Sequence, residues 1–386
     1  MLRIGVLLPR SSLFPAFGLD ILNGIKSCLK HYGIFDEFKL LTDNIGFGIE
    51  EAEIYTKAER LLLQEDADIV MVVADNNIAE LLEPLFTTSN KLLLMVNMGA
   101  GLPDVWQSAP TTIVHSLNLS FHARLTGKLA AQENENKKGI YVLSYYDAGY
   151  RQGYSMMTSH QQNGGEPMYT HVTHLKAEQF TLEPVDEFLR ENEDVKTLLC
   201  LFTADMAEQF CNAVLPLQEK FQLRIYASPM LLEAYQAYFA NKQLPAPALK
   251  GYSSWLPELD NPGNEIYRSA FKKAAGKDAT LFGVLGWDAA LLLKEILVQY
   301  HQGNTSPAEI VPALSSTVYE SPRGWMKLDP KTFYTYGPSR LISWSANGVA
   351  KTTEDIIGTE QEWELFSADK YPSDSHSGWR NTDLCI

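Results

Sequence analysis

The sequence lacks any apolar stretch of the length that a membrane-spanning helix needs, which is about 20 residues. Its most apolar helical segment, residues 281–300, is interrupted by Asp288, Lys294 and Glu295. The opening MLRIGVLLP also lacks the basic region, the long apolar region and the small-residue cleavage site of a signal peptide. We therefore expect no membrane insertion, and we expect the first residues to form a buried strand.

Cysteine is scarce, and the common catalytic motifs are missing. The four cysteines, at positions 28, 200, 211 and 385, show no CxxC spacing, which argues against a disulfide framework and against a structural zinc site. HExxH, GxSxG and GxxxxGK motifs are absent. The sequence therefore lacks the usual signatures of zinc proteases, serine hydrolases and P-loop enzymes. We predict mostly buried thiols, no metal, no cofactor and no catalytic residues.

For two short motifs, we favour a structural interpretation over a functional one. GAGLPD at residues 99–104 begins like a dinucleotide-binding turn, but Asp104 replaces the third glycine and Pro103 interrupts the turn. We interpret it as a strand-to-helix loop whose small residues let a ligand approach the backbone. His171 and His174 could share a metal, yet no carboxylate or cysteine cluster joins them, so surface histidines are the favoured interpretation.

The chain also has fewer basic than acidic residues. The chain has 32 basic and 47 acidic residues, which gives a net charge of -15. Such a surface repels phosphate backbones and anionic headgroups, and it therefore argues against nucleic acid and membrane surfaces as partners. Hydrophobic residues make up 45% and charged residues 20% of the chain, a composition typical of a compact globular protein.

The pattern of apolar residues predicts the fold class. A length of 386 residues predicts two cores at roughly 100 to 200 residues each. Short apolar runs alternate with helical patterns over the first 120 residues, and a second series of the same kind begins at residue 139. This alternation is typical of βαβ units on a parallel sheet. We predict an α/β fold with two doubly wound lobes, each built on a parallel sheet.

Aromatic side chains gather in loops that follow the predicted strands. Tyr145 and Tyr150 crowd the loop after one strand. Phe202 ends another strand, and Trp255 lies in a loop beyond the second series. Aromatic residues in such loops are suited to line a cleft and to hydrogen-bond a ligand. We predict that these four residues contribute to a binding site.

Two amide side chains directly follow the strand DIVMVV. Asn76 and Asn77 stand where an amide either caps the next helix or hydrogen-bonds a ligand. Both roles are compatible, so we include both residues among the candidates for ligand binding.

Taken in order, these segments resemble the type I periplasmic binding proteins, in particular the branched-chain amino-acid (leucine/isoleucine/valine) receptors of ABC transporters. The resemblance covers about residues 2–350. It depends on RIGVLLP, the FG at Phe17, ADNNIAELLEPLF, LLLMVNMGAGLPD, YDAGYRQGY, LDNPGNEIYRSAFKKAAGKDATLFGVLGWDAALLL, the PRG turn at Pro322 and a YGP-containing strand.

The resemblance implies two α/β lobes joined by a three-strand hinge, with a ligand trapped between them. One lobe would comprise residues 1–118 and 250–330, and the other residues 119–249 and 331–360, followed by a C-terminal surface tail at 361–386. The implied ligand positions lie near these residues: Phe17, Asn77, Gly99, Gly101, Tyr150, Phe202 and Met230.

Two departures from the amino-acid receptors bear on the ligand. Where those receptors hold the ligand carboxylate with a hydroxyl residue, this chain has Gly101; where they hold the ammonium group with an acidic residue, it has Pro229 and Met230. An α-amino acid would lose both side-chain anchors, and a buried unpaired charge is costly. We therefore predict a neutral or weakly polar ligand, such as an amide, an aromatic acid or a small peptide-like metabolite.

The resemblance implies a non-catalytic binding protein, the solute receptor of an ABC-type importer, with a permease as partner. A cytoplasmic ligand sensor of the same fold that regulates a partner protein is one alternative, and an unrecognised α/β enzyme is another. The family implies a periplasmic or extracytoplasmic location. A native start at Met1 would instead favour the cytoplasm, since no signal peptide is present.

Overall fold

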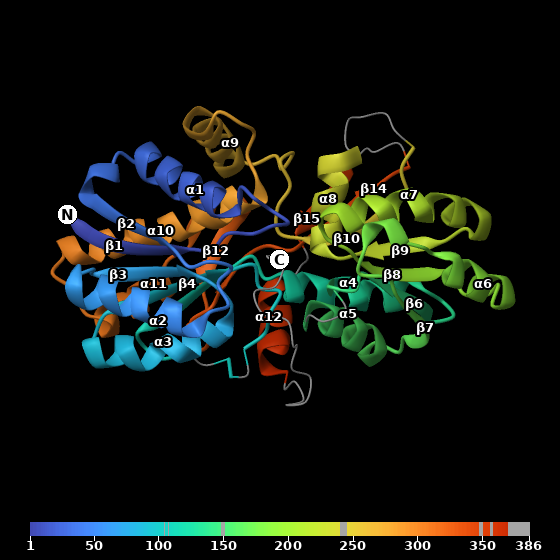
Figure 1. The fold of residues 1–386 in the computed structure, drawn as a ribbon, viewed down its shortest axis with the longest axis horizontal. Helices are drawn as coiled ribbons and strands as arrows, with labels where there is room; N and C mark the ends of the chain where they lie inside the picture. Colours follow the sequence, from blue (N-terminus) through green and yellow to red (C-terminus); the bar gives the residue numbers. More distant parts are fainter. Residues whose placement is uncertain are drawn as a thin grey trace.

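The computed structural model describes residues 1–103, 105–106, 108–147, 151–239, 245–346, 350–355 and 358–369. Within these residues the chain forms two lobes that lie side by side (Figure 1). Each lobe has its own sheet, and helices pack on both faces of each.

The sheet of the first lobe has five parallel strands in the order β2-β1-β3-β4-β5 over the described part of the chain. The strands are β1 (Leu2–Leu8), β2 (Phe38–Asn44), β3 (Ile69–Val73), β4 (Leu92–Asn97) and β5 (Thr112–Ser116). Every residue of β3, β4 and β5 is buried. Continuous apolar runs such as IVMVV are typical of a parallel sheet that is covered on both faces.

The sheet of the second lobe has seven strands in the described residues, in the order β15-β14-β10-β9-β8-β6-β7. They are β6 (Lys138–Leu143), β7 (Glu166–Val172), β8 (Thr197–Leu201), β9 (Arg224–Ala227), β10 (Leu249–Ser253), β14 (Arg340–Trp344) and β15 (Ala350–Asp355). Strands β6 to β10 are parallel, as predicted, but β14 is antiparallel to β10 and β15 is antiparallel to β14. The chain enters β14 from the first lobe without a crossover helix, and it therefore runs against β10.

Helices cover both sheets. The first lobe holds α1 (Phe17–His31), η1 (Phe35–Glu37), α2 (Glu51–Glu59), η2 (Arg60–Gln64), α3 (Asn76–Ser89), α9 (Pro262–Ala275), α10 (Leu281–His301) and α11 (Pro307–Ser316). The second lobe holds α4 (Leu119–Glu133), α5 (Arg151–Gln162), η4 (Ala177–Gln179), α6 (Glu183–Glu191), α7 (Ala204–Phe221) and α8 (Pro229–Phe239).

Helix α10 shows how a late segment joins the first lobe. It packs along α1, and a Cβ atom added at Gly24 would lie only 2.1 Å from the carbonyl oxygen of Gly283. Glycine is therefore required where these two helices approach each other. Thr280 caps α10 by accepting a hydrogen bond from the backbone N–H of Gly283.

The described chain passes between the lobes three times, at residues 117–118, 254–261 and 337–339. Before the third passage, a small antiparallel sheet of β11 (Tyr319–Ser321), β12 (Gly324–Leu328) and β13 (Thr335–Tyr336) packs beside β5 and α11. The first passage is bonded to β13, just before the third, because the Asn118 side chain donates to the Thr335 carbonyl over 3.0 Å. The lobe boundaries at 250 and 330 stay a prediction; β10 pairs within the second sheet, whereas β13 packs on the first lobe.

The C-terminal segment departs from the predicted surface tail. Residues Thr359–Ala368 form helix α12, in which Trp363 and Phe366 are each 2% exposed. The correction has a simple cause, because two large aromatic residues three positions apart share one face of a helix and bury it together. Residues 370–386 lie outside the described part. Among the helices of the described residues, none is long and apolar enough to cross a bilayer.

Candidate functional site

In open α/β sheets, ligands bind beyond the carboxyl ends of the parallel strands, so the residues that follow each strand are the candidates. In the first lobe, Asn76 begins α3 directly after β3 and is buried. Its side-chain oxygen accepts from the Asn97 amide over 3.2 Å and from the Tyr334 hydroxyl over 3.1 Å. Its side-chain nitrogen donates to the Gly101 carbonyl over 3.2 Å. These contacts join the start of α3, the end of β4 and the segment before β13 into one polar network.

Gly99 and Gly101 have different surroundings. Gly99 has a φ of +75°, and a Cβ atom there would lie 2.3 Å from the Ser116 hydroxyl. Its N–H donates to the side chain of Asn97, and its carbonyl accepts from the N–H of Ser120. Gly99 is therefore a packing position in this structure. A Cβ atom at Gly101, by contrast, would have only the Asp75 carboxyl group nearby, at 3.7 Å.

Asn77 and Asp75 lie beside this network at the start of α3. Both are partly exposed. The Asn77 side-chain nitrogen lies 3.5 Å from a carboxylate oxygen of Glu51 at the start of α2. Asp75 occupies the N-cap position of α3, and its carboxylate faces Gly101. Asp75 was not among the sequence-based candidates, although it directly precedes Asn76.

Two of the predicted aromatic residues lie in the hydrophobic core. Phe17 is 1% exposed and meets Phe282 edge to face, with ring centroids 4.8 Å apart. Phe202 is fully buried and stacks on Phe210 with centroids 4.4 Å apart. Each ring already has an aromatic partner within its own lobe.

Met230 and Trp255 are also interior. Met230, near the start of α8, is 1% exposed, and Trp255 is 5% exposed. The Trp255 indole N–H donates to the side-chain oxygen of Asn264 over 2.9 Å, and its ring packs edge-on to Tyr267. Trp255 therefore connects the second passage between the lobes to α9.

Tyr145 differs from these residues, because it is 44% exposed. Its ring meets Tyr146 edge to face, with centroids 6.0 Å apart. Both follow β6 at the carboxyl edge of the second sheet. Tyr150 lies outside the described residues.

Sequence reasoning missed Asp147, which fixes the loops at this edge. Its two carboxylate oxygens accept hydrogen bonds from the Ser144 hydroxyl, over 2.5 Å, and from the Thr203 hydroxyl, over 2.9 Å. Burial raises the pKa of Asp147, and the two hydroxyl donors partly oppose that rise. The contacts connect the loop after β6 to the loop after β8. The signal in the sequence was a serine followed by an aspartate three positions later, directly after a strand.

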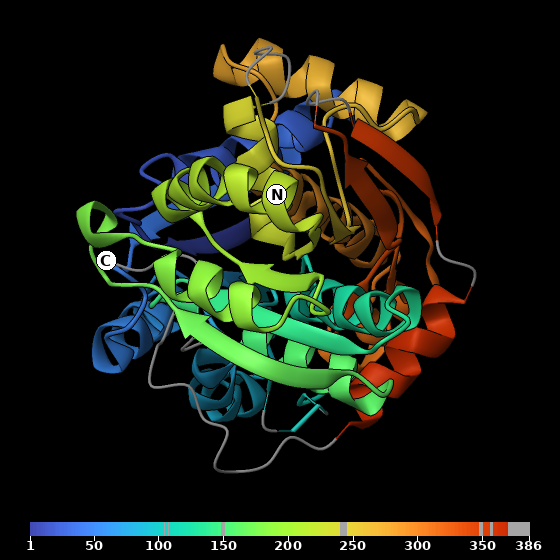
Figure 2. The same cartoon turned by 90° about the vertical axis from the view of Figure 1, so that its right-hand side faces the viewer.

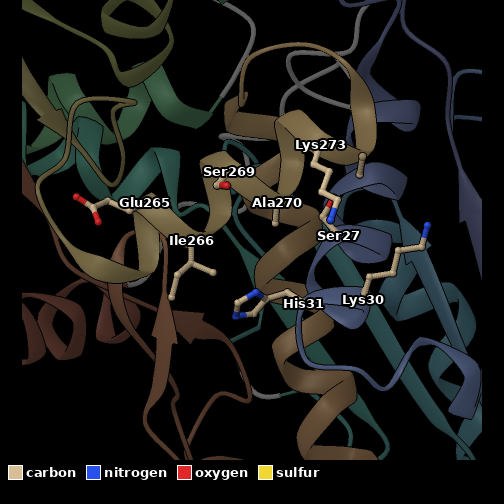
Figure 3. A pocket seen from close by; sticks show the side chains of 9 residues that line it. Ser27, Lys30, His31, Glu265, Ile266, Ser269, Ala270 and Lys273 are labelled. Carbon is tan, nitrogen blue, oxygen red and sulfur yellow. The ribbon is translucent and has the colours of Figure 1, made fainter.

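A half-open hollow of about 730 Å³ lies elsewhere, between α1 and α9 (Figure 3). It is lined by Ser27, Lys30, His31, Glu265, Ile266, Ser269, Ala270, Lys273 and Ala274. Its α1 residues belong to the end of that helix opposite Phe17 and the strand edge. The basic side chains lie in the last turns of α1 and α9, where they complement the helix dipoles. We do not assign the predicted ligand site to this hollow.

Comparison with known proteins then identifies the family. A family model described as periplasmic binding protein matches residues 1–349. The chain belongs to this family. The resemblance predicted from the sequence motifs is thus confirmed, and so is the two-lobed α/β fold. No curated protein matches the sequence.

Solved structures of periplasmic binding proteins share the fold at low sequence identity. An ABC transporter substrate-binding protein from Sphaerobacter thermophilus is 16% identical, with 92% of this chain and 98% of that chain covered and a TM-score of 0.75. A solute-binding protein of an ABC transporter from R. palustris, in complex with benzoate, is 18% identical, with coverages of 92% and 96% and a TM-score of 0.71. A leucine-binding protein from Thermotoga maritima is 14% identical, with coverages of 93% and 100% and a TM-score of 0.64.

Proposed function

We propose that this chain is the solute receptor of an ABC-type importer, and that it holds one small molecule between its lobes without catalysis. The observation that carries the proposal is the family match over residues 1–349. The two parallel sheets, whose strand ends carry the polar and aromatic residues described above, support it. An extracytoplasmic location and a permease partner belong to the same proposal.

We infer that the ligand has an apolar or aromatic body with few polar groups, as an aromatic acid or an amide has. The position implied for the ammonium anchor of an amino acid is Met230, which is buried and apolar. The Asp147 carboxylate in the second lobe already accepts hydrogen bonds from two hydroxyl groups. An ammonium group closed into this cleft would therefore lack the acidic anchor of the amino-acid receptors, and an unpaired buried charge is costly.

The relatives offer both ligand classes for comparison. Solute-binding proteins from R. palustris are seen in complex with benzoate and with 4-hydroxybenzoate, and the Thermotoga maritima relative is a leucine-binding protein. In this proposal the ligand favours the closed arrangement only through the contacts that it makes better there. A micromolar affinity corresponds to roughly -8 kcal/mol, and a small buried molecule with a few hydrogen bonds reaches that value.

The ligand class is tested by calorimetric titration of the purified chain with benzoate, 4-hydroxybenzoate, acetamide and leucine. We expect at least one of the first three to bind and leucine to give no heat. A ligand at about 100 times its Kd should also stabilise the fold by about 2.7 kcal/mol. Leucine binding would overturn the proposed ligand class. Conversion of a bound compound to a product, detected by mass spectrometry, would overturn the binding-only proposal.

A further inference from the structure

Helix α12 occupies a special position in the chain. It follows β15, the outermost strand of the sheet in the second lobe, so the chain reaches it from that lobe. The family match ends at residue 349, and α12 lies beyond it. Figure 1 shows this helix between the lobes, and both views, Figure 1 and Figure 2, place it beside α4, drawn in teal.

The buried face of α12 packs on the first lobe. The ring of Trp363 stacks on Tyr336 of β13, with centroids 5.3 Å apart and an interplanar angle of 7°. It also meets Trp106, from the loop after β4, at 5.5 Å, and its indole N–H donates to Asp329 over 3.0 Å. Phe366 meets Trp106 at 5.2 Å.

The same helix also contacts α4, which packs on α5 and on strands of the second sheet. Glu362 forms an ion pair of 2.5 Å with Lys128, and Asp369, directly after α12, pairs with Arg124. Near the start of α4, the ring of Phe121 lies 5.6 Å from Trp363 and 5.3 Å from Phe366.

Two further ion pairs tie α12 to the first lobe. Glu360 pairs with Lys327 of β12 over 2.5 Å, and Glu364 pairs with Lys331 over 3.0 Å. Exposed pairs of this kind are each weak, about 0 to 1 kcal/mol. The buried aromatic cluster is the stronger contact, because burying one large side chain contributes roughly 1.5–3 kcal/mol. The helix is thus attached to the second lobe by the chain and by its contacts with α4, and to the first lobe by the aromatic contacts and these ion pairs.

We propose that α12 is a fourth connection between the lobes and that it limits how far they open. The three chain passages form a hinge, and a hinge alone leaves the opening angle to the contacts around it. Opening that moves α4 away from β12 and β13 would separate α12 from one of its two sets of partners. The proposal concerns the lobe motion on which the proposed function depends, but its test needs no ligand.

The test measures the distance between the lobes in the ligand-free protein. Spin labels are placed on Lys272→Cys in α9 and Glu191→Cys in α6, both exposed, in a Cys385→Ser background. The three cysteines at 28, 200 and 211 are buried. The distance distribution is compared between the full chain and a chain that ends at residue 357. We expect the shorter chain to show a shift to longer distances and a broader distribution.

A chain that ends at Asp369 is the matched control, because it keeps α12 and loses only the segment beyond it. We expect its distance distribution to equal that of the full chain. Equal distributions for the chains ending at 357 and at 369 would overturn the proposal. Circular dichroism checks that each variant is folded. The interlobe distances are independent of the titrations, so a wrong ligand class and a wrong role for α12 are distinguishable.

Removal of α12 exposes apolar surface, and the shorter chain could fail to fold. The double substitution Arg124→Glu, Lys128→Glu then serves as the second variant. It reverses the charge that faces Glu362 and Asp369 and leaves the aromatic cluster in place. We expect a smaller shift in the same direction, and an additional Glu362→Lys substitution should partly restore the original distribution. A double variant with unchanged distances would contradict the proposal.

Discussion

The loop-bearing edges of the two sheets are built differently. In the first lobe, Asn76, Asn97 and Tyr334 satisfy one another in a buried network of uncharged groups. In the second lobe, hydroxyl groups hold the Asp147 carboxylate, and Tyr145 stands partly exposed beside it. The first edge is thus fixed by its own hydrogen bonds, whereas the second keeps an aromatic side chain accessible. The difference teaches that loops at the equivalent ends of the two sheets are fixed by different kinds of side chain.

The largest expected effect belongs to Phe202, which the sequence places beside Tyr145 as a cleft residue and which the structure buries. Phe202→Ala should lower the free energy of unfolding by about 3–5 kcal/mol, because it removes a fully buried ring and leaves a cavity. Urea denaturation measures the change. A decrease in the free energy of unfolding below 1 kcal/mol would mean that the ring does not pack in the core. The structural distinction between Phe202 and Tyr145 would then be wrong.

Asn76 and Asn77 offer a sharper comparison within the first edge. Asn76→Ala should lower the free energy of unfolding by about 2–3 kcal/mol, because it leaves buried polar partners unsatisfied. Asn77→Ala is the matched control, and the change should stay within about 0.5 kcal/mol because this side chain is partly exposed. Thermal and urea denaturation of both variants check the difference. Equal losses would indicate that the network around Asn76 is not a structural unit.

Asp147 predicts a pH dependence of stability that arises at the second edge. Its raised pKa means that the folded state binds the proton more tightly than the unfolded state. Its contribution to stability is therefore complete below the ordinary aspartate pKa, about 3.9, and is lost as the pH rises toward the folded pKa. Asp147→Asn removes this titration, so the free energy of unfolding of the variant relative to the parent should rise over that interval.

Each unit of pKa difference corresponds to about 1.4 kcal/mol. Urea denaturation at several pH values from 3.5 upward measures the slope. A flat difference curve for Asp147→Asn would contradict the role of burial at this carboxyl group.

The fold was largely predictable, because alternating apolar runs and helical patterns specify parallel sheets directly. The continuous run IVMVV at Ile69–Val73 is an example. The antiparallel direction of β14 and β15 was harder to predict from the sequence, since strand direction depends on where the chain returns from the other lobe. Helix α12 was missed because its two buried aromatic residues stand among six acidic and polar ones, in a segment next to a polar tail.

The candidate site was predictable only as a set of loops. Strand ends can be located from the sequence, but whether a side chain points into its own lobe depends on tertiary packing. Phe202 finds a stacking partner in Phe210, eight positions later, and Trp255 finds a hydrogen-bond acceptor in Asn264. Neither partner is evident from local pattern. The role of Asp147 was not predictable because one of its two donors, Thr203, follows a different strand and meets it only in the folded sheet.

Tyr145 gives the smallest effect on stability and the most direct information on binding. Tyr145→Ala should change the free energy of unfolding by no more than about 0.5 kcal/mol, because the side chain is 44% exposed. It should nevertheless weaken binding of the ligand found by titration, since an aromatic contact in a closed cleft contributes about 1 kcal/mol, or roughly fivefold in Kd. Tyr145→Phe separates the two parts of the side chain: retained affinity would assign the contact to the ring, and lost affinity would assign it to the hydroxyl group. An unchanged Kd in Tyr145→Ala would show that this exposed aromatic residue of the second edge does not contact the ligand. The two edges would then differ in structure alone.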